Sequence, residues 1–179
     1  MLTVIIGGAR SGKSRLAQNL CSGAERVAYL ATARLEDAEM HARAKRHRCD
    51  RPALWTTIEE PLALADAVRR AAPHFDRILV DCLTVWLGNL CWEHREREAR
   101  ELEVIASREI SRLAEAATAA DVILVSNEVG CGIVPENPVG RVFRDLQGLV
   151  NQQIARAADT VYLAVAGIAL QVKPGGVAI

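Results

Sequence analysis

The feature that most restricts the fold is an octapeptide near the start of the chain, Gly7–Ser14, which reads GGARSGKS. It fits the pattern G-x-x-x-x-G-K-[ST], in which a glycine-rich loop joins a β-strand to an α-helix and wraps its backbone N–H groups around phosphates. Lys13 is then expected to reach the outer phosphates, and Ser14 to place its hydroxyl on Mg²⁺. The alternative interpretation is a glycine turn that binds no nucleotide. The predicted phosphate-binding residues are Gly7, Gly8, Ala9, Arg10, Ser11, Gly12, Lys13 and Ser14.

Short apolar runs alternate with longer helical patterns along the chain. Strands are expected at Thr3–Gly7, Arg26–Thr32, Arg77–Cys82, Asp121–Asn127 and Thr160–Val165, with a last edge strand from Gly167 onward. Helices are expected near Lys13–Ser22, Glu36–His47, Pro61–Ala72, Glu93–Ala119 and Pro138–Ala158. Runs rich in Val, Ile and Leu suit strands that are buried on both faces. Without a linker or repeat, residues 1–179 are predicted to form one α/β domain, a P-loop NTPase of the RecA-like type with a mainly parallel central sheet flanked by helices.

Two of these helices carry more detailed predictions. In the fourth, apolar residues at spacings of three and four predict one buried stripe, formed by Leu102, Ala106, Ile110, Leu113 and Ala117. The charged run EHREREARELE at its start is interpreted as a solvated helix face with ion pairs. Asn137 is predicted to cap the fifth helix, since Pro138 suits a first helical turn.

Composition restricts the class of protein further. The chain has 22 basic and 22 acidic residues, and this balance disfavours nucleic acid as a partner. Its five cysteines are scattered, without the close spacing of a zinc or redox site, and are interpreted as reduced thiols. The first apolar run is too short for a signal peptide, and no window reaches the length of a membrane span. We therefore expect a cytoplasmic protein.

In parallel sheets of this kind, ligands bind beyond the carboxyl ends of the strands. Asp81 ends the apolar run RILVD and is the best candidate for the acid on the metal side, with capping of the segment from Thr84 as the alternative. Glu128 follows another strand and is expected to orient a water or a hydroxyl, or to make a structural hydrogen bond. The loop Gly130–Pro138 is interpreted as a cover over substrate, a simple crossover or a subunit contact.

Beyond the phosphate loop, three stretches carry a family resemblance: YLATA at Tyr29–Ala33, EMHARAKRHRCDRPALWTTIEEP at Glu39–Pro61, and the long stretch from Asn127 to Gly167. With GGARSGKS, they resemble the bifunctional cobinamide kinase/cobinamide-phosphate guanylyltransferases of adenosylcobalamin biosynthesis. The resemblance covers nearly the whole chain. It implies that a nucleoside triphosphate, ATP or GTP, phosphorylates adenosylcobinamide, and that GMP is then transferred from GTP to adenosylcobinamide phosphate through a GMP-histidine. It also implies Mg²⁺ and a homotrimer.

The family histidine follows the methionine of the E-M motif by seven residues and precedes R-P-x-x-W. Measured from Met40, that position is His47, which the resemblance makes the catalytic nucleophile beside Lys13. Cationic neighbours favour the neutral imidazole that such an attack needs. The other GTP-site positions implied are Thr32, Ala33, Arg34, Arg48, Cys49, Asp50, Arg51, Glu59 and Asp81.

Two rival functions remain at this point. One is a single-activity P-loop kinase for a small molecule, in which His47 is a phosphate contact or a surface residue on a charged helix. The other is a regulatory module that uses the nucleotide as a switch. Retention of label from the α-phosphate of GTP separates the first rival from a guanylyltransferase, and turnover of adenosylcobinamide separates the second from an enzyme.

Overall fold

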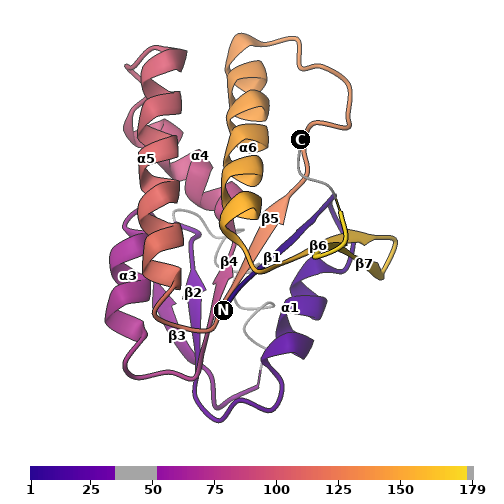
Figure 1. Ribbon diagram of the computed structural model, residues 1–179. Helices are drawn as coiled ribbons and strands as arrows, with labels where there is room; N and C mark the ends of the chain where they lie inside the picture. The colour runs from indigo at the N-terminus through magenta and orange to yellow at the C-terminus, as the bar shows by residue number, and fades with distance from the viewer. Residues whose placement is uncertain (35–51, 177–179) are drawn as a thin grey trace.

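A computed structural model describes residues 1–34 and 52–176. Within them, the core is a seven-stranded sheet in the order β3-β2-β4-β5-β1-β6-β7. Its neighbouring strands pair in parallel except β6 and β7, which form an antiparallel hairpin at one edge (Figure 1). The strands are β1 (Leu2–Gly7), β2 (Val27–Ala31), β3 (Thr56–Glu59), β4 (Arg77–Asp81), β5 (Val122–Asn127), β6 (Thr160–Val165) and β7 (Ile168–Lys173).

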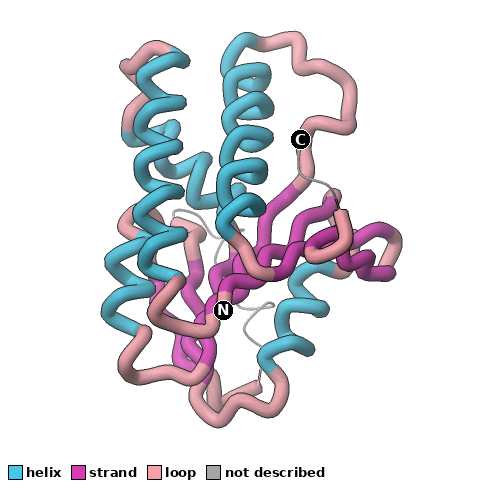
Figure 2. The backbone as a smooth tube through the Cα atoms, viewed as in Figure 1, coloured by secondary structure: helices cyan, strands magenta, loops and turns pink. Residues whose placement is uncertain are grey.

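Helices cover both faces of the sheet (Figure 2). They are α1 (Lys13–Cys21), α3 (Leu64–Ala71), α4 (Leu83–Glu93), α5 (Ala99–Ala117) and α6 (Pro138–Ala157). On one face, α1 packs against strand residues such as Ile5 and Leu79, while α3 to α6 pack on the other face against residues such as Val4 and Val80. Successive strand side chains point to opposite faces, so every central strand is buried on both sides. This confirms the predicted mainly parallel sheet flanked by helices.

The helix predictions are confirmed where the sequence carries a strong local signal, as in α5 and α6. All five residues of the expected stripe on α5 are buried. At α6, the Asn137 side chain accepts a hydrogen bond from the Gly140 N–H at 2.6 Å, which confirms the cap. The expected helix Glu36–His47 lies outside the described residues.

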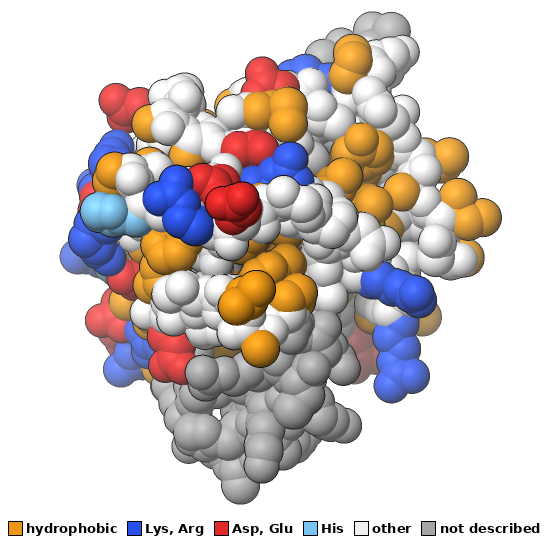
Figure 3. Space-filling model, turned by 90° about the horizontal axis from the view of Figure 1, so that it is seen from below, with side chains coloured by type: hydrophobic (Ala, Val, Ile, Leu, Met, Phe, Trp, Pro, Cys, Tyr) orange, Lys and Arg blue, Asp and Glu red, His pale blue; other side chains and the backbone are white. Residues whose placement is uncertain are grey.

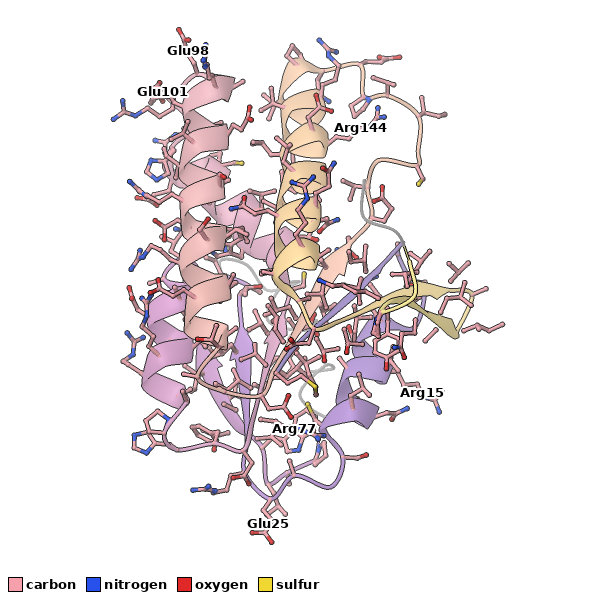
Figure 4. The ribbon with its side chains drawn as sticks, in the orientation of Figure 1. Arg15, Glu25, Arg77, Glu98, Glu101 and Arg144 are labelled. Atoms are coloured by element: carbon pink, nitrogen blue, oxygen red, sulfur yellow. The ribbon has the colours of Figure 1, made fainter. Side chains whose placement is uncertain are left out.

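The predicted helix Glu93–Ala119 was wrong in its first turns. Helix α4 ends at Glu93 and α5 begins only at Ala99, so part of the charged run is a connection. Glu98 and Glu101 form a capping box, in which each side chain accepts a hydrogen bond from the backbone of the other. Figure 4 shows both glutamates at the end of α5. A capping box satisfies N–H groups that the first helical turn leaves free, and here it places the helix start inside the charged run.

Two elements were not predicted. Helix α4, LTVWLGNLCWE, is apolar and contains Val, Thr and Trp, so its composition does not suggest a helix. Strand β3 has only four residues and forms the edge of the sheet beside β2. Helix α3 also begins at Leu64 rather than at Pro61, and in the connection before it the Glu60 carboxylate accepts hydrogen bonds from the N–H groups of Leu62 and Ala63. Helix α4 and strand β3 depend on neighbours that a single segment does not reveal.

Among the described residues, Cys21, Cys82, Cys91 and Cys131 are free cysteines; Cys49 lies outside the described residues. Burial raises the pKa of Cys21 to about 11 and also raises the pKa of Cys82 and Cys91. These three thiols are therefore protonated and weakly nucleophilic at neutral pH. Among the described helices, none is long and apolar enough to cross a membrane. Acidic and basic side chains are intermixed on the face of the molecule shown in Figure 3.

Candidate functional site

The phosphate loop connects β1 to α1 where the sequence predicts it. Gly7 ends the strand, and Lys13 begins the helix after Gly12, whose φ of 97° lies in the left-handed region. Gly7 must lack a side chain, because a Cβ there would lie 2.3 Å from the carbonyl oxygen of Ala164. Arg10 also has a positive φ, 56°. These conformations curl the loop around the start of α1, where helix N–H groups attract phosphate.

Lys13 lies within this loop rather than in solvent. Its side chain is 7% exposed, and its Nζ donates hydrogen bonds to the Gly8 carbonyl oxygen at 2.6 Å and to the Ser11 hydroxyl at 3.4 Å. Burial lowers the pKa of Lys13, and the nearby Cys82 and Asp81 act in the opposite direction. The charge of Asp81 thus acts on the ammonium group, although Lys13 follows β1, Asp81 ends β4, and β5 lies between these two strands.

The turn between β6 and β7 contacts the phosphate loop and supports it. Gly167, in the turn between β6 and β7, donates its N–H to the Ser11 carbonyl oxygen at 3.0 Å. The backbones approach so closely that a Cβ on Gly12 would lie 3.3 Å from the Cα of Gly167. Ala166 and Gly167 both have positive φ, at 50° and 82°. The sequence alone predicts only the start of an edge strand at this turn, and no local signal marks its contact with the loop.

Asp81 ends β4, and its side chain lies on the α1 face of the sheet together with Leu79. Its Oδ2 accepts a hydrogen bond from the Tyr29 hydroxyl at 2.8 Å. The alternative role of Asp81 as a cap is not seen: Cys82 occupies the N-cap position of α4, and no side chain caps that helix within the described residues. In the sequence, Tyr29 stands out only as part of a family stretch and as the single hydroxyl in the otherwise aliphatic run VAYLA.

Further predicted residues lie at the carboxyl end of β2, next to the carboxyl end of β4. Thr32 is fully buried, and its Oγ1 donates to the Cys82 carbonyl oxygen and accepts from the Cys82 N–H, each at 2.9 Å. Helix α4 holds this segment as well, since Asn89 donates to the Thr32 carbonyl oxygen at 2.7 Å and Glu93 pairs with Arg34 at 3.1 Å. Thr32 and Arg34 are therefore placed by a helix that the sequence did not predict.

The remaining predicted residues divide into three groups. Ala33 follows Thr32 at the β2 end, and Glu59 is exposed at the end of β3, in register with Ala31. Outside the described residues lie His47, Arg48, Cys49, Asp50 and Arg51. Glu128 makes structural bonds: its Oε1 accepts from the N–H groups of Gly130 and Cys131, and its own N–H donates to the Gly7 carbonyl oxygen at 3.0 Å. This glutamate thus shapes the loop Gly130–Pro138.

The two predicted metal donors, Ser14 in the loop and Asp81 at the end of β4, suit Mg²⁺ better than a transition metal. Among the described residues there is no group of three or more His, Cys, Asp or Glu side chains that could hold a metal ion. A hydroxyl on Ser14 and a carboxylate on Asp81 are hard oxygen ligands, and Mg²⁺ commonly takes one or two protein oxygens and completes its shell with phosphates and water. The residues present therefore fit a magnesium ion that arrives with the nucleotide.

Two kinds of comparison relate this chain to known proteins. The family profile described as cobinamide kinase / cobinamide phosphate guanyltransferase matches residues 3–172. The bifunctional adenosylcobalamin biosynthesis protein CobU of Salmonella typhimurium is 41% identical over 181 positions, which cover 97% of this chain and all of the relative. The protein CobP of the same description from Pseudomonas aeruginosa is 43% identical over 175 positions, covering 97% of this chain and 98% of the relative.

A solved structure also resembles the fold. An ATPase from the type III secretion system of pathogenic bacteria superposes with a TM-score of 0.55 at 11% identity, over 95% of this chain and 56% of that chain. This likeness concerns the fold alone and agrees with the predicted α/β class. The family match, together with a phosphate loop in the expected geometry, supports a more specific conclusion. The chain belongs to the family of bifunctional cobinamide kinases and cobinamide-phosphate guanylyltransferases, which act in adenosylcobalamin biosynthesis.

Proposed function

We propose that both reactions use one nucleotide site, built on the phosphate loop and the carboxyl ends of β2 and β4. The observation that carries this proposal is the position of Lys13, whose ammonium group is hydrogen-bonded within the loop and is influenced by the charge of Asp81. Loop N–H groups and Lys13 would hold the triphosphate and balance its charge. Such preorganised charge stabilises the transition state in phosphoryl transfer.

In the kinase reaction, the aminopropanol hydroxyl of adenosylcobinamide attacks the γ-phosphorus of ATP or GTP. The bond between that phosphorus and the β–γ bridging oxygen breaks, and a nucleoside diphosphate leaves. Lys13 stays beside the transferred group, while Ser14 and Asp81 would hold Mg²⁺, which supplies charge neutralisation at the phosphates. Arg10 has its backbone in the same loop and adds a cation near the phosphates.

In the guanylyl transfer, a neutral nitrogen of His47 attacks the α-phosphorus of GTP and pyrophosphate leaves. The resulting phosphoramidate transfers GMP to adenosylcobinamide phosphate and regenerates the histidine. Support for His47 comes from its spacing from Met40 and from the R-P-x-x-W motif that follows it. Thr32, Arg34 and Glu59 are proposed to line the guanine nucleotide, together with Ala33 and residues 48–51.

We also propose a homotrimer. Strand β7 is an edge strand whose apolar side chains remain in contact with water: Ile168 is 66% exposed and Leu170 is 54% exposed. An unpaired edge with apolar side chains favours association with another chain. The family resemblance supplies the number of subunits.

The nucleophile is tested by replacing His47. His47→Ala should abolish formation of the acid-labile, base-stable GMP-enzyme while most of the kinase activity remains, because phosphorylation needs no covalent intermediate. The measurement is retention of α-phosphate label after denaturation, with phosphorylation of adenosylcobinamide assayed in parallel. His41→Ala is the matched control, since it removes another histidine of the same segment. A GMP adduct of normal yield in His47→Ala would place the nucleophile elsewhere, with His41 as the first candidate.

A further inference from the structure

Tyr29 is a buried residue of β2 that has no assigned part in either reaction. Its side chain is 4% exposed and packs on the α1 face of the sheet in a cluster with residues that include Ile5, Leu79 and Val125. Such packing restricts the ring to one orientation. A buried tyrosine hydroxyl needs a hydrogen-bond partner, and here that partner is the Asp81 carboxylate.

The strand register explains how the two side chains meet. Strands β2 and β4 run parallel, with Tyr29 opposite Leu79 and Ala31 opposite Asp81. Side chains two positions apart on a strand share a face, so Tyr29 and Asp81 are diagonal neighbours on the α1 face. The small side chain of Ala31 leaves room for the tyrosine to reach forward. Its hydroxyl donates to Oδ2 at 2.8 Å, and Oδ1 remains outside this bond.

The backbone at Asp81 is held by the same strand. Thr32 follows β2, and its hydroxyl makes two hydrogen bonds of 2.9 Å to the backbone of Cys82, the residue after Asp81. The end of β2 thus restrains the Asp81 backbone through Thr32 and its carboxylate through Tyr29. Both contacts lie toward the carboxyl ends of β2 and β4, where the charge of Asp81 raises the pKa of Lys13 against the effect of burial.

We propose that Tyr29 is a positioning residue for Asp81. Its hydroxyl fixes Oδ2, so that the carboxylate presents Oδ1 to the Mg²⁺ of the nucleotide complex without first having to reorient. Partners of this kind behind a metal ligand commonly contribute 10- to 100-fold in metal affinity. This inference rests on the proposed role of Asp81, and the experiment below separates the two.

The variant Tyr29→Phe isolates the hydroxyl. Phenylalanine keeps the ring and its packing, so the fold should be retained while the hydroxyl bond to Oδ2 is lost. The chain contains one other tyrosine, Tyr162 on β6, whose ring packs at the rim of the same cluster. Tyr162→Phe therefore makes the same chemical change on the same face of the sheet, away from Asp81, and serves as the matched control.

The measurement is binding of a fluorescent GDP analogue at increasing Mg²⁺ concentration, with a parallel series in EDTA and a thermal melt of each protein. We expect Tyr29→Phe to raise the Mg²⁺ concentration for half-saturation about 10-fold, while nucleotide affinity in EDTA stays unchanged. Tyr162→Phe should match the wild type in all three measurements. Adding Mg²⁺ to excess should restore nucleotide binding in Tyr29→Phe.

Two results would overturn the inference. One is an unchanged Mg²⁺ dependence in Tyr29→Phe. The other is weaker nucleotide binding in EDTA together with a lower melting temperature, which would mean that the hydroxyl only stabilises the fold. Asp81→Asn is measured in the same series. If it also leaves the Mg²⁺ dependence unchanged, the proposed metal role of Asp81 fails; if it shifts the dependence and Tyr29→Phe does not, only the role of Tyr29 fails.

Discussion

Among the residues of the phosphate loop, Lys13 has the most direct proposed part in the chemistry. Lys13→Ala should reduce both activities by several orders of magnitude, because each reaction needs the triphosphate charge balanced by this group. Both activities are measured on the same preparation. Arg15→Ala is the control, since Arg15 is an exposed cation two positions further along α1 and points away from the sheet in Figure 4. Near-normal kinase activity in Lys13→Ala would contradict a shared site.

The loss of activity in Lys13→Ala should not come from unfolding. Burial lowers the pKa of Lys13, so the folded protein binds this proton less tightly than the unfolded chain does. Below the folded pKa, the charged amine therefore costs stability rather than adding it. We expect the melting temperature of Lys13→Ala without nucleotide to equal or exceed that of the wild type at neutral pH.

At the scale of elements, the contact between the β6–β7 turn and the phosphate loop leads to a separate prediction. Alanine at Gly167, where φ is 82°, strains the turn and displaces the N–H that holds the Ser11 carbonyl oxygen. Loss of one such bond should weaken nucleotide binding about 2- to 10-fold. Gly23→Ala is the control, because Gly23 has a φ of 92° in open space. Equal nucleotide affinities in the two variants, measured by titration, would mean that the turn does not support the loop.

Elements were predictable where local pattern and burial agree. The α5 stripe and the Asn137 cap follow from spacing within one segment, and both were confirmed. Helix α4 was missed because its four buried residues, Leu83, Trp86, Leu87 and Leu90, occur in a sequence that is apolar nearly throughout. A helix that is apolar on most sides carries no periodic signal and is defined only by what surrounds it.

At the scale of the whole molecule, we expect three chains to associate. Light scattering at micromolar concentration should give about three times the 19.5 kDa mass of one chain, because the exposed apolar edge at β7 gains from burial. The mass should not depend on nucleotide if that edge alone holds the subunits together. A monomer mass accompanied by full activity would rule out the trimer as the working form.

The sequence by itself determined the phosphate loop, the alternation of strands and helices, and the position of Asp81 at a strand end. Each depends on residues that are close together along the chain. Only the tertiary structure decided which groups hold those residues in place. Tyr29 reaches Asp81 across 52 positions, and Gly167 reaches Ser11 from the far end of the chain. Such contacts follow from strand order and register, which arise when the sheet assembles as a whole, and no local pattern encodes them.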